Sequence, residues 1–168
     1  MPITSAELVQ TLDSVHGRTR RVISCITEDD LEWSIAPGRF TIGDLVRHLA
    51  TIERYMYGET IQGRPSSYSG CGREMADGLD DVIALYDRLH QESRNIFLSV
   101  TDGDLSAKVM TPADMPITGW KWMRAMFEHE AHHRGQLYLM LGVRGRAVPP
   151  IYGLTSEEVA ARSASTRS

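Results

Sequence analysis

Residues 118–142 carry the longest run of helical periodicity in the chain, and this run constrains the fold more than any other feature. Its large apolar residues recur at intervals of three and four and gather on one side of a helical wheel. Gly142 is placed to end the helix, and Pro149–Pro150 rule out its continuation. We therefore expect one long helix here, with other helices packed against its apolar side.

Three further long helices and one short helix are predicted from apolar periodicity and capping residues. The first runs from a capping box at Thr4–Glu7 to about residue 27, and the second begins at the N-cap residue Thr41. The third spans about residues 79–100. A second capping box at Thr155–Glu158 begins a short helix that reaches about residue 163.

The connections between these helices are long and contain glycine and proline. Residues 58–78 are predicted to be the crossover of a bundle, and residues 101–119 a second long loop, in which residues 108–110 could be an extended arm. We find no convincing pair of β-strands and no domain boundary. The predicted fold class is therefore all-α, with residues 1–162 in a single domain and residues 163–168 as a frayed tail.

The composition argues against several classes of protein. The chain has 168 residues, a formal net charge of −4 and no run of five like charges, so we expect no nucleic-acid partner and no anionic membrane surface. It has no apolar run near the ~20 residues of a membrane span, and its polar N-terminus is not a signal peptide. Cys25 and Cys71 make no motif, which is typical of reduced thiols in a cytoplasmic protein.

Two histidines of the long helix, His129 and His133, are four residues apart and therefore share one face. They extend the apolar sector of the helix and are flanked by Trp122, Met126 and Met140. Two neutral imidazoles in such a dry lining can share a metal ion. The alternative is a pair of packed, hydrogen-bonded histidines at the edge of a bundle.

The other histidines give weaker signals. His132 points away from the pair, towards the surface or an outer layer of a site, and His16 and His90 are predicted to be solvated. His48 lies at the edge of the apolar stripe of the second helix, where a lone histidine is usually structural.

Glu130 and Arg134 are charged residues four apart inside the apolar stripe of the long helix. Buried charges have to be paired. We therefore predict a Glu130–Arg134 pair, or a wider polar network, at an interface between helices or subunits. An exposed pair one helical turn apart is the alternative.

Residues 129–133 also match the H-E-x-x-H motif of zinc proteases, in which two histidines bind zinc and the glutamate activates water. Such enzymes need a third ligand downstream and a sheet edge that holds an extended peptide. The chain has neither the longer H-E-x-x-H-x-x-G-x-x-H motif nor an evident sheet, and Glu157 and Glu158 belong to a separate capped helix. A protease is therefore disfavoured.

Two motifs about 80 residues apart carry a resemblance to a known family. The long helix contains His129-x-x-His132-His133-Arg134-Gly135-Gln136-Leu137, and the second helix begins with Phe40-Thr41-Ile42-Gly43-Asp44-Leu45-Val46-Arg47-His48-Leu49. Both resemble signatures of the DinB family, the DinB/YfiT-like metalloenzymes, and residues 149–153 are similar to the tail of many members. The resemblance covers nearly the whole chain and is weakest in the loops between helices.

The resemblance implies a four-helix bundle with a crossover, usually a homodimer. It also implies a divalent metal ion bound by His48, His129 and His133, all of which are present. Zinc or nickel is expected first and iron or manganese as alternatives, because the spacing of imidazoles does not choose among such metals. Three protein ligands with a fourth position open to water match a catalytic site and not a closed structural one.

Relatives of known activity are similar to thiol transferases that use low-molecular-weight thiols such as bacillithiol or mycothiol. The first hypothesis is therefore a metal-dependent thiol S-transferase acting on small electrophiles, in which Arg134 or Gln136 could orient a histidine or contact the substrate. The second is a metal-dependent hydrolase with a metal-bound hydroxide and Glu130 or another carboxylate as the base. The third is a metal-binding dimer without turnover.

Overall fold

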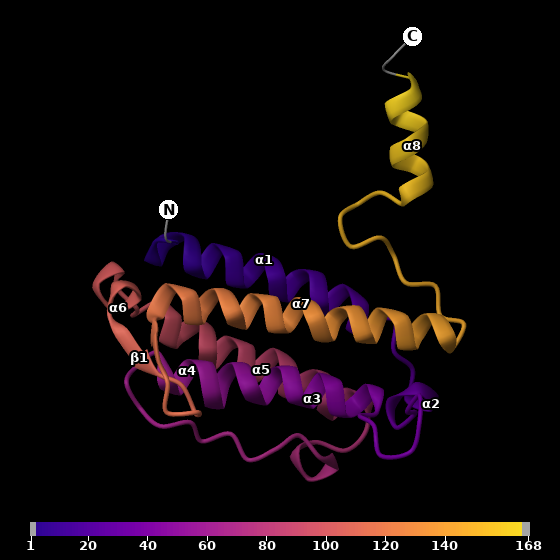
Figure 1. The fold of residues 1–168 in the computed structure, drawn as a ribbon. Helices are drawn as coiled ribbons and strands as arrows, with labels where there is room; N and C mark the ends of the chain where they lie inside the picture. Colours follow the sequence, from indigo (N-terminus) through magenta and orange to yellow (C-terminus); the bar gives the residue numbers. More distant parts are fainter. Residues whose placement is uncertain (1–2, 166–168) are drawn as a thin grey trace.

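The computed structural model describes residues 3–165, which form a bundle built on four long helices (Figure 1). The long helices are α1 (Ser5–Ile23), α3 (Ile42–Ile52), α5 (Leu79–Phe97) and α7 (Gly119–Val143). The shorter elements are α2 (Glu28–Leu31), the π-helix η1 (Glu53–Tyr57), α4 (Gly58–Thr60), the 3-10 helix η2 (Arg73–Met75), α6 (Asp102–Ser106), strands β1 (Lys108–Met110) and β2 (Pro116–Thr118), and α8 (Ser156–Ser165). The predicted all-α class and four-helix bundle are confirmed.

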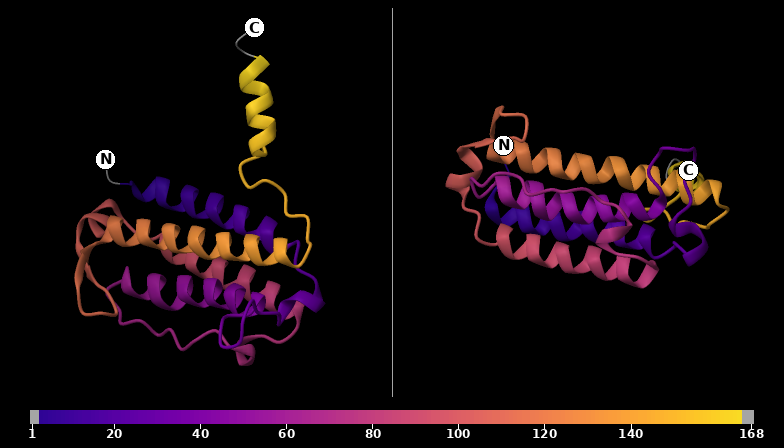
Figure 2. Two further views of the ribbon diagram at one scale, coloured as in Figure 1. Left: turned by 45° about the vertical axis from the view of Figure 1, so that its right-hand side comes forward. Right: turned by 90° about the horizontal axis from the view of Figure 1, so that it is seen from below.

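The order of the helices explains why one connection has to be long. Helices α1 and α7 lie side by side and run in one direction, whereas α3 and α5 lie side by side and run in the opposite direction (Figures 1 and 2). Parallel neighbours cannot be joined by a tight turn, so the chain must return along the length of the bundle between α3 and α5. Residues 61–78 make this return across the outside of the bundle, as predicted for the crossover.

Threonine capping boxes determine where several helices begin, and two of these boxes also limit the length of the preceding helix. The predicted box at Thr4–Glu7 starts α1, and Thr41–Asp44 starts α3 with hydrogen bonds of 2.9 and 3.0 Å. Helix α1 ends at Ile23, short of the predicted residue 27, because a further box at Thr27–Asp30 begins α2. Likewise α5 ends three residues before residue 100, because the box at Thr101–Asp104 begins α6.

A short β-hairpin precedes α7, which corrects the prediction that the chain has no strand pair. Val109 of β1 pairs with Ile117 of β2, and Val109 is buried in the same cluster as Leu105. Strands of three residues are too short to show the alternation by which strands are recognised in a sequence. Directly after the hairpin, a Cβ on Gly119 would lie 2.6 Å from the Asp104 carbonyl oxygen, so only glycine fits where α7 begins.

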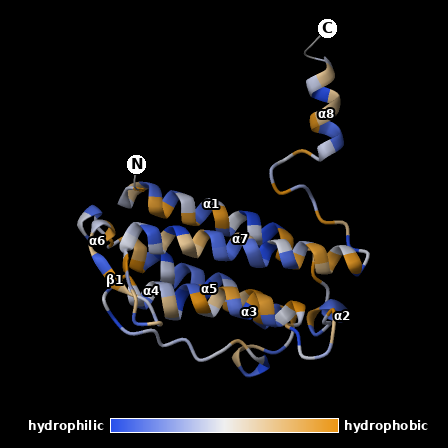
Figure 3. Cartoon of the chain, viewed as in Figure 1, coloured by the Kyte–Doolittle hydropathy of each residue, from blue (hydrophilic) through white to orange (hydrophobic). Residues whose placement is uncertain are grey.

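Two apolar clusters fill the bundle, one towards each end. One includes Val22, Leu45, Leu89 and Leu141, and the other includes Leu8, Leu12, Phe97 and Met123. Burial of each such side chain contributes about 1.5–3 kcal/mol. Figure 3 shows apolar and polar residues interspersed along the long helices, and the apolar residues that face inward form the core.

The end of α7 is fixed by charge. Asp30 of α2 is fully buried, and its carboxylate accepts hydrogen bonds from Arg144 at 2.9 Å and from Arg146 at 2.7 Å. The left-handed glycine beyond the helix is Gly145, with φ +74°, and not the predicted Gly142, which lies within α7. The two arginines therefore hold the last turn of α7 against α2 while Gly145 turns the chain away.

Helix α8 projects away from the bundle, and none of its residues is buried (Figure 1). Residues 163–165, predicted to belong to a frayed tail, continue this helix, whereas residues 166–168 of that tail lie outside the described residues. Between residues 3 and 165, no helix has both the length and the hydropathy needed to cross a bilayer.

Candidate metal centre

Three imidazoles from two helices meet on one side of the bundle. His48 comes from α3, and His129 and His133 occupy successive turns of α7. The Nε2 atom of His129 lies 3.2 Å from Nε2 of His48 and 3.0 Å from Nε2 of His133. The structure therefore brings together the three histidines that the family resemblance assigns to the metal.

The geometry of the three histidines fits a divalent metal ion. Imidazole nitrogens that bind zinc at about 2.0–2.1 Å in a tetrahedral arrangement lie roughly 3.3 Å apart. Two of the nitrogen pairs are close to this separation, and one ligand atom from each residue lies within 4.8 Å of the others. Three neutral imidazoles are also a suitable donor set for zinc, nickel or iron.

The outer nitrogens of two imidazoles are held by side chains that fix their orientation. His48 Nδ1 lies 2.9 Å from the hydroxyl of Tyr68, and His133 Nδ1 lies 2.7 Å from Oε1 of Gln136. Because an amide oxygen can only accept, His133 must carry its proton on Nδ1, which leaves the Nε2 lone pair facing the other histidines. Tyr68 and Gln136 thus stand in the place of the hydrogen-bond partners that orient metal-binding histidines.

Burial keeps the three imidazoles neutral. His48 and His133 are 8% and 9% exposed, and His129 is half-buried. Burial lowers the pKa of His48 and of His129 to about 4, with a further contribution from the neighbouring imidazoles. Burial also lowers the pKa of His133. At neutral pH, all three lone pairs are therefore available to a cation.

The crossover segment brings Tyr68 to the site. Cys71 lies close enough to the Tyr68 hydroxyl to influence its pKa, and the Gly70 carbonyl accepts a hydrogen bond from the Thr51 hydroxyl of α3 at 3.2 Å. Cys71, predicted to lie outside any motif, is therefore near the residue that hydrogen-bonds to His48. Burial raises the pKa of the Cys71 thiol, so it is a poor nucleophile at neutral pH.

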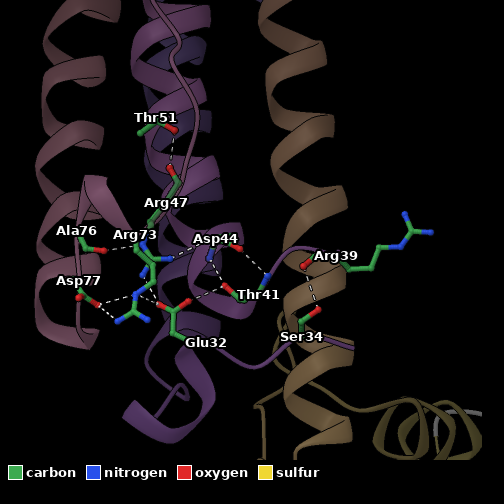
Figure 4. A network of polar contacts seen from close by, with 10 residues as sticks. All are labelled: Glu32, Ser34, Arg39, Thr41, Asp44, Arg47, Thr51, Arg73, Ala76 and Asp77. Carbon is green, nitrogen blue, oxygen red and sulfur yellow. Dashed lines mark hydrogen bonds and ion pairs between the residues drawn. The ribbon is translucent and has the colours of Figure 1, made fainter. Parts of the chain in front are cut away.

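A fully buried arginine fastens the same segment to α3 (Figure 4). The Arg47 guanidinium donates to the Ala76 carbonyl at 2.8 Å, to Asp44 at 3.1 Å and to Glu32 at 2.6 Å. The two carboxylates come from α3 and from the end of α2, and the carbonyl comes from the crossover. Arg47 thus ties three segments together one residue before His48, which fixes the start of α3 relative to the loop that carries Tyr68.

Glu130 and Arg134 lie elsewhere, in the helix interface. Both are buried, and Glu130 accepts a hydrogen bond from Tyr86 of α5 at 3.1 Å, whereas Arg134 donates to Thr19 of α1 at 3.3 Å. Burial raises the pKa of the Glu130 carboxyl, and nearby Glu53 raises it further. Among the described residues, no ion pair joins Glu130 to Arg134, so the predicted direct pair is not formed. Each is instead hydrogen-bonded to a neighbouring helix, as in the predicted wider polar network, and the exposed pair is excluded. Neither residue contacts the three histidines, so Glu130 is badly placed to act as a base there.

The remaining histidines divide into one exposed residue and one buried pair. His132 is exposed, and its Nε2 lies 3.2 Å from the Gln136 amide nitrogen. The prediction that His16 and His90 are solvated is wrong. Their rings stack with centroids 3.4 Å apart, and His90 is only 8% exposed. A single histidine in a helix is typical of a surface position, but both of these histidines face the gap between α1 and α5.

The sequence alone does not predict that Tyr68, Phe40 and Arg47 lie around the site. Tyr68 lies in a glycine-rich loop that has no periodicity, so no sequence pattern marks it. Phe40 lies with its ring centroid 5.5 Å from that of His48, and Arg47 is buried beside it. For Arg47, the sequence does contain a signal. Asp44 and Arg47 are opposite charges three residues apart, a spacing that places them on one helix face and predicts an ion pair.

The comparisons with known proteins identify a family and a fold. The model of the DinB superfamily matches residues 11–137. A DinB-like protein from Bacillus cereus is 21% identical with a TM-score of 0.72, over 89% of this chain and 99% of that chain. The DinB-like protein YjoA from Bacillus subtilis is 18% identical with a TM-score of 0.69, over 88% of this chain and 99% of that chain.

A third similar structure is YfiT from Bacillus subtilis, described as a probable metal-dependent hydrolase with an unusual four-helix bundle topology. It is 16% identical with a TM-score of 0.67, over 85% of this chain and 89% of that chain. At these identities, the likeness to the solved structures shows the fold alone. A search of curated proteins finds no match.

Proposed function

The chain belongs to the DinB superfamily, and from this premise we propose that it is a divalent-metal-dependent enzyme that transfers a low-molecular-weight thiol to small electrophiles. The observation that carries the proposal is the convergence of three neutral imidazoles, two of them with their Nδ1 atoms held by neighbouring side chains. A divalent cation held by His48, His129 and His133 would supply Lewis-acid chemistry and lower the pKa of a thiol or water beside it.

The protein side chains around the site would orient the ligands and limit the access of water. Tyr68 and Gln136 hold two of the imidazoles in place. Tyr57 is 4% exposed and lies with its ring centroid 6.2 Å from that of His129, and Phe40 covers His48. Rings on two sides of the histidines lower the local polarity, which strengthens electrostatic interactions at the site.

The lack of a reactive protein thiol and of a carboxylate among the candidate metal ligands favours thiol transfer. Cys71 is buried and its pKa is raised, so the reacting sulfur would come from a bound thiol. Among the described residues, the group that could hold a metal contains no carboxylate, and Glu130 is hydrogen-bonded to Tyr86. In thiol transfer, the sulfur forms a bond to the electrophilic carbon as the leaving group departs with its electron pair. The thiol proton passes to solvent, so no protein base is required.

Hydrolysis is the second candidate function. It is favoured by the likeness of the fold to YfiT, which is described as a probable metal-dependent hydrolase. In that reaction, water would take the place of the thiol at the same histidines. A carboxylate base would assist hydrolysis, and within residues 3–165 the group of residues that could hold the metal includes no carboxylate.

Activity assays distinguish these functions. Protein purified without a histidine tag is analysed for zinc, nickel, iron and manganese and then assayed with 1-chloro-2,4-dinitrobenzene and a thiol, and separately with p-nitrophenyl acetate and no thiol. Thiol conjugation that is lost in His48→Ala supports the proposal. Ester hydrolysis without conjugation supports the second candidate. Tight metal binding without either activity supports a non-catalytic metal-binding protein.

A homodimer is the assembly that the family resemblance implies, and we retain it as part of the proposal. Sedimentation velocity across a tenfold concentration range measures it directly. A single monomeric species throughout that range would contradict it.

A further inference from the structure

A cleft opens beside the three histidines and is not explained by metal binding. It has a volume of about 500 Å³ and lies between α7 and the loop that precedes α3. His133 and Gln136 form part of its wall, so the cleft reaches one of the candidate metal ligands and the side chain that orients it. A molecule bound in the cleft would therefore extend to the metal centre.

The wall of the cleft is largely apolar, and several of its apolar side chains are exposed. Ile35, Phe40 and Leu139 are 56%, 44% and 61% exposed, although each is large and apolar. Leu45 and Met140 form buried parts of the same wall. Exposed apolar side chains that gather at one concave place indicate a surface that an apolar ligand covers.

Arg39 is the one charged residue among those that line the cleft. Its guanidinium makes no ion pair or hydrogen bond with any residue between 3 and 165, and Figure 4 shows it extending away from the network of Glu32, Asp44 and Arg47. An unpaired guanidinium beside an apolar surface matches a ligand with an apolar body and a carboxylate.

The loop that forms this wall is held in shape before any ligand binds. The Ser34 hydroxyl donates to the Ala36 carbonyl at 2.7 Å and to the Arg39 carbonyl at 3.2 Å. Ser34 also forms a β-bridge with Thr41. Because the backbone around Arg39 is already ordered, little conformational entropy is lost when a ligand is bound there.

We propose that this cleft binds the electrophilic substrate, and that this substrate is a small organic anion with an apolar body and a carboxylate held by Arg39. The claim that the reactive end of this substrate lies beside the histidines rests on the proposed function. The claim that an apolar anion binds in the cleft is independent of that function, because binding requires only the cleft and Arg39.

The test compares two probes of similar size and shape, the anion 4-ethylbenzoate and the neutral 4-ethylbenzamide. Their dissociation constants are measured on metal-free protein by ligand-observed NMR, so that the carboxylate has no metal to bind. We expect the benzoate to bind roughly three to ten times more tightly than the amide, the effect of about 1 kcal/mol from one partly exposed ion pair. Arg39→Gln should remove this preference, and Leu139→Ala should weaken both probes.

The matched control is Arg88→Gln, which removes a 59% exposed arginine on α5, a helix that does not line the cleft. It should leave the preference for the benzoate unchanged. Equal affinities of the two probes in the wild type, a preference that survives Arg39→Gln, or no binding of either probe would overturn the inference. These outcomes are independent of metal binding and turnover, so they are separate from a failure of the proposed function.

If thiol transfer is observed, a second measurement assigns the carboxylate to the electrophile. Arg39→Gln should raise the KM for 4-(chloromethyl)benzoate about threefold to tenfold, with little change in the KM for 4-(chloromethyl)benzamide or for the thiol. A rise in the KM for the thiol alone would show that Arg39 binds the thiol and would contradict the assignment.

Discussion

Two groups of histidines lie in the same bundle and differ in the way their rings meet. His48, His129 and His133 point their Nε2 atoms towards one another, with separations of 3.0 and 3.2 Å. His16 and His90 instead stack face to face, with ring planes 13° apart. In the stacked pair, the nitrogens lie at the ring edges and face different neighbours, so the two rings cannot direct their lone pairs at one cation.

The surroundings of the two groups differ as well. Carboxylates approach the stacked pair: Glu53 lies 3.3 Å from His90 Nδ1, and Asp87 lies 3.8 Å from His16 Nε2. The three converging histidines have a hydroxyl and an amide as neighbours and face a cleft. The number of nearby imidazoles is therefore a poor guide to a metal site. The direction of their lone pairs and the partners of their outer nitrogens are the better guides.

The largest expected effect is the loss of metal binding in His129→Ala. The Nε2 atom of His129 lies close to the Nε2 atoms of both His48 and His133. Its removal leaves only two of the three imidazole ligands. We expect the affinity for zinc or nickel to fall by more than about 100-fold, because even outer partners of metal ligands contribute about 10–100-fold.

Competition with a chromophoric chelator measures this change, and His132→Ala is the matched control. His132 is exposed and lies beside the Gln136 amide and the edge of the His133 ring, but it is not one of the three converging histidines. Its removal should therefore keep one metal per chain and change the affinity much less. Equal loss in both variants would remove the distinction between the converging histidines and their neighbours.

The second expected effect is a loss of folding stability when one histidine of the stacked pair, His90, is removed. His90→Ala removes a buried ring, leaves a cavity between α1 and α5, and leaves Glu53 without its imidazole neighbour. We expect the free energy of unfolding to decrease by about 2–4 kcal/mol in urea denaturation. Metal affinity should stay within about twofold of the wild type, since equilibrium effects at separated sites are close to independent. A loss of metal binding in a folded His90→Ala protein would show that the two groups act together.

A smaller effect is expected when an outer partner of the converging histidines is removed. Tyr68→Phe deletes the hydroxyl that lies 2.9 Å from His48 Nδ1 while keeping the ring. Metal affinity should decrease about tenfold, the lower end of the range for such partners. Tyr152→Phe, at a 76% exposed position, is the control and should have no measurable effect on calorimetric titration. An unchanged affinity in Tyr68→Phe would mean that His48 is oriented by packing alone.

The last expected effect is the response of the metal-free protein to acid. The pKa of His48 and of His129 is lowered to about 4 and that of His16 to about 3, against 6.5 in the unfolded chain. Unfolded protein therefore binds more protons, and the free energy of unfolding should decrease as the pH falls from about 6.5 towards 4. Saturating zinc should add stability at pH 7 that is lost in the same interval. Denaturation curves that do not change between pH 7 and pH 5 would contradict the buried, neutral state of these histidines.

Much of the fold could be predicted because its signals are local. Capping boxes and apolar periodicity give the four long helices, and the spacing of His129 and His133 places two imidazoles on one face. Errors in the helix ends arise where a second capping box, at residues 27–30 or 101–104, competes with the end of a helix. The hairpin was missed because three-residue strands carry almost no pattern.

The parts of the site that could not be predicted depend on contacts between distant residues. Tyr68 reaches His48 only because the crossover passes over α3, and no local pattern in a glycine-rich loop reveals that path. The stacking of His16 on His90 likewise depends on how α1 and α5 face each other. His48 alone resembled a structural histidine, and the family resemblance was the reason to group it with His129 and His133.

The crossover also has a consequence for the order of folding. His48 and His129 are 81 residues apart in the chain, and the histidines converge only after the crossover has returned and α7 has packed. Contacts of such long range form late, because the entropy of closing the loop is lost before the contact stabilises the chain. During synthesis, the first imidazole leaves the ribosome long before the other two. A metal added to refolding protein should therefore accelerate the early collapse little and slow the unfolding of the finished bundle.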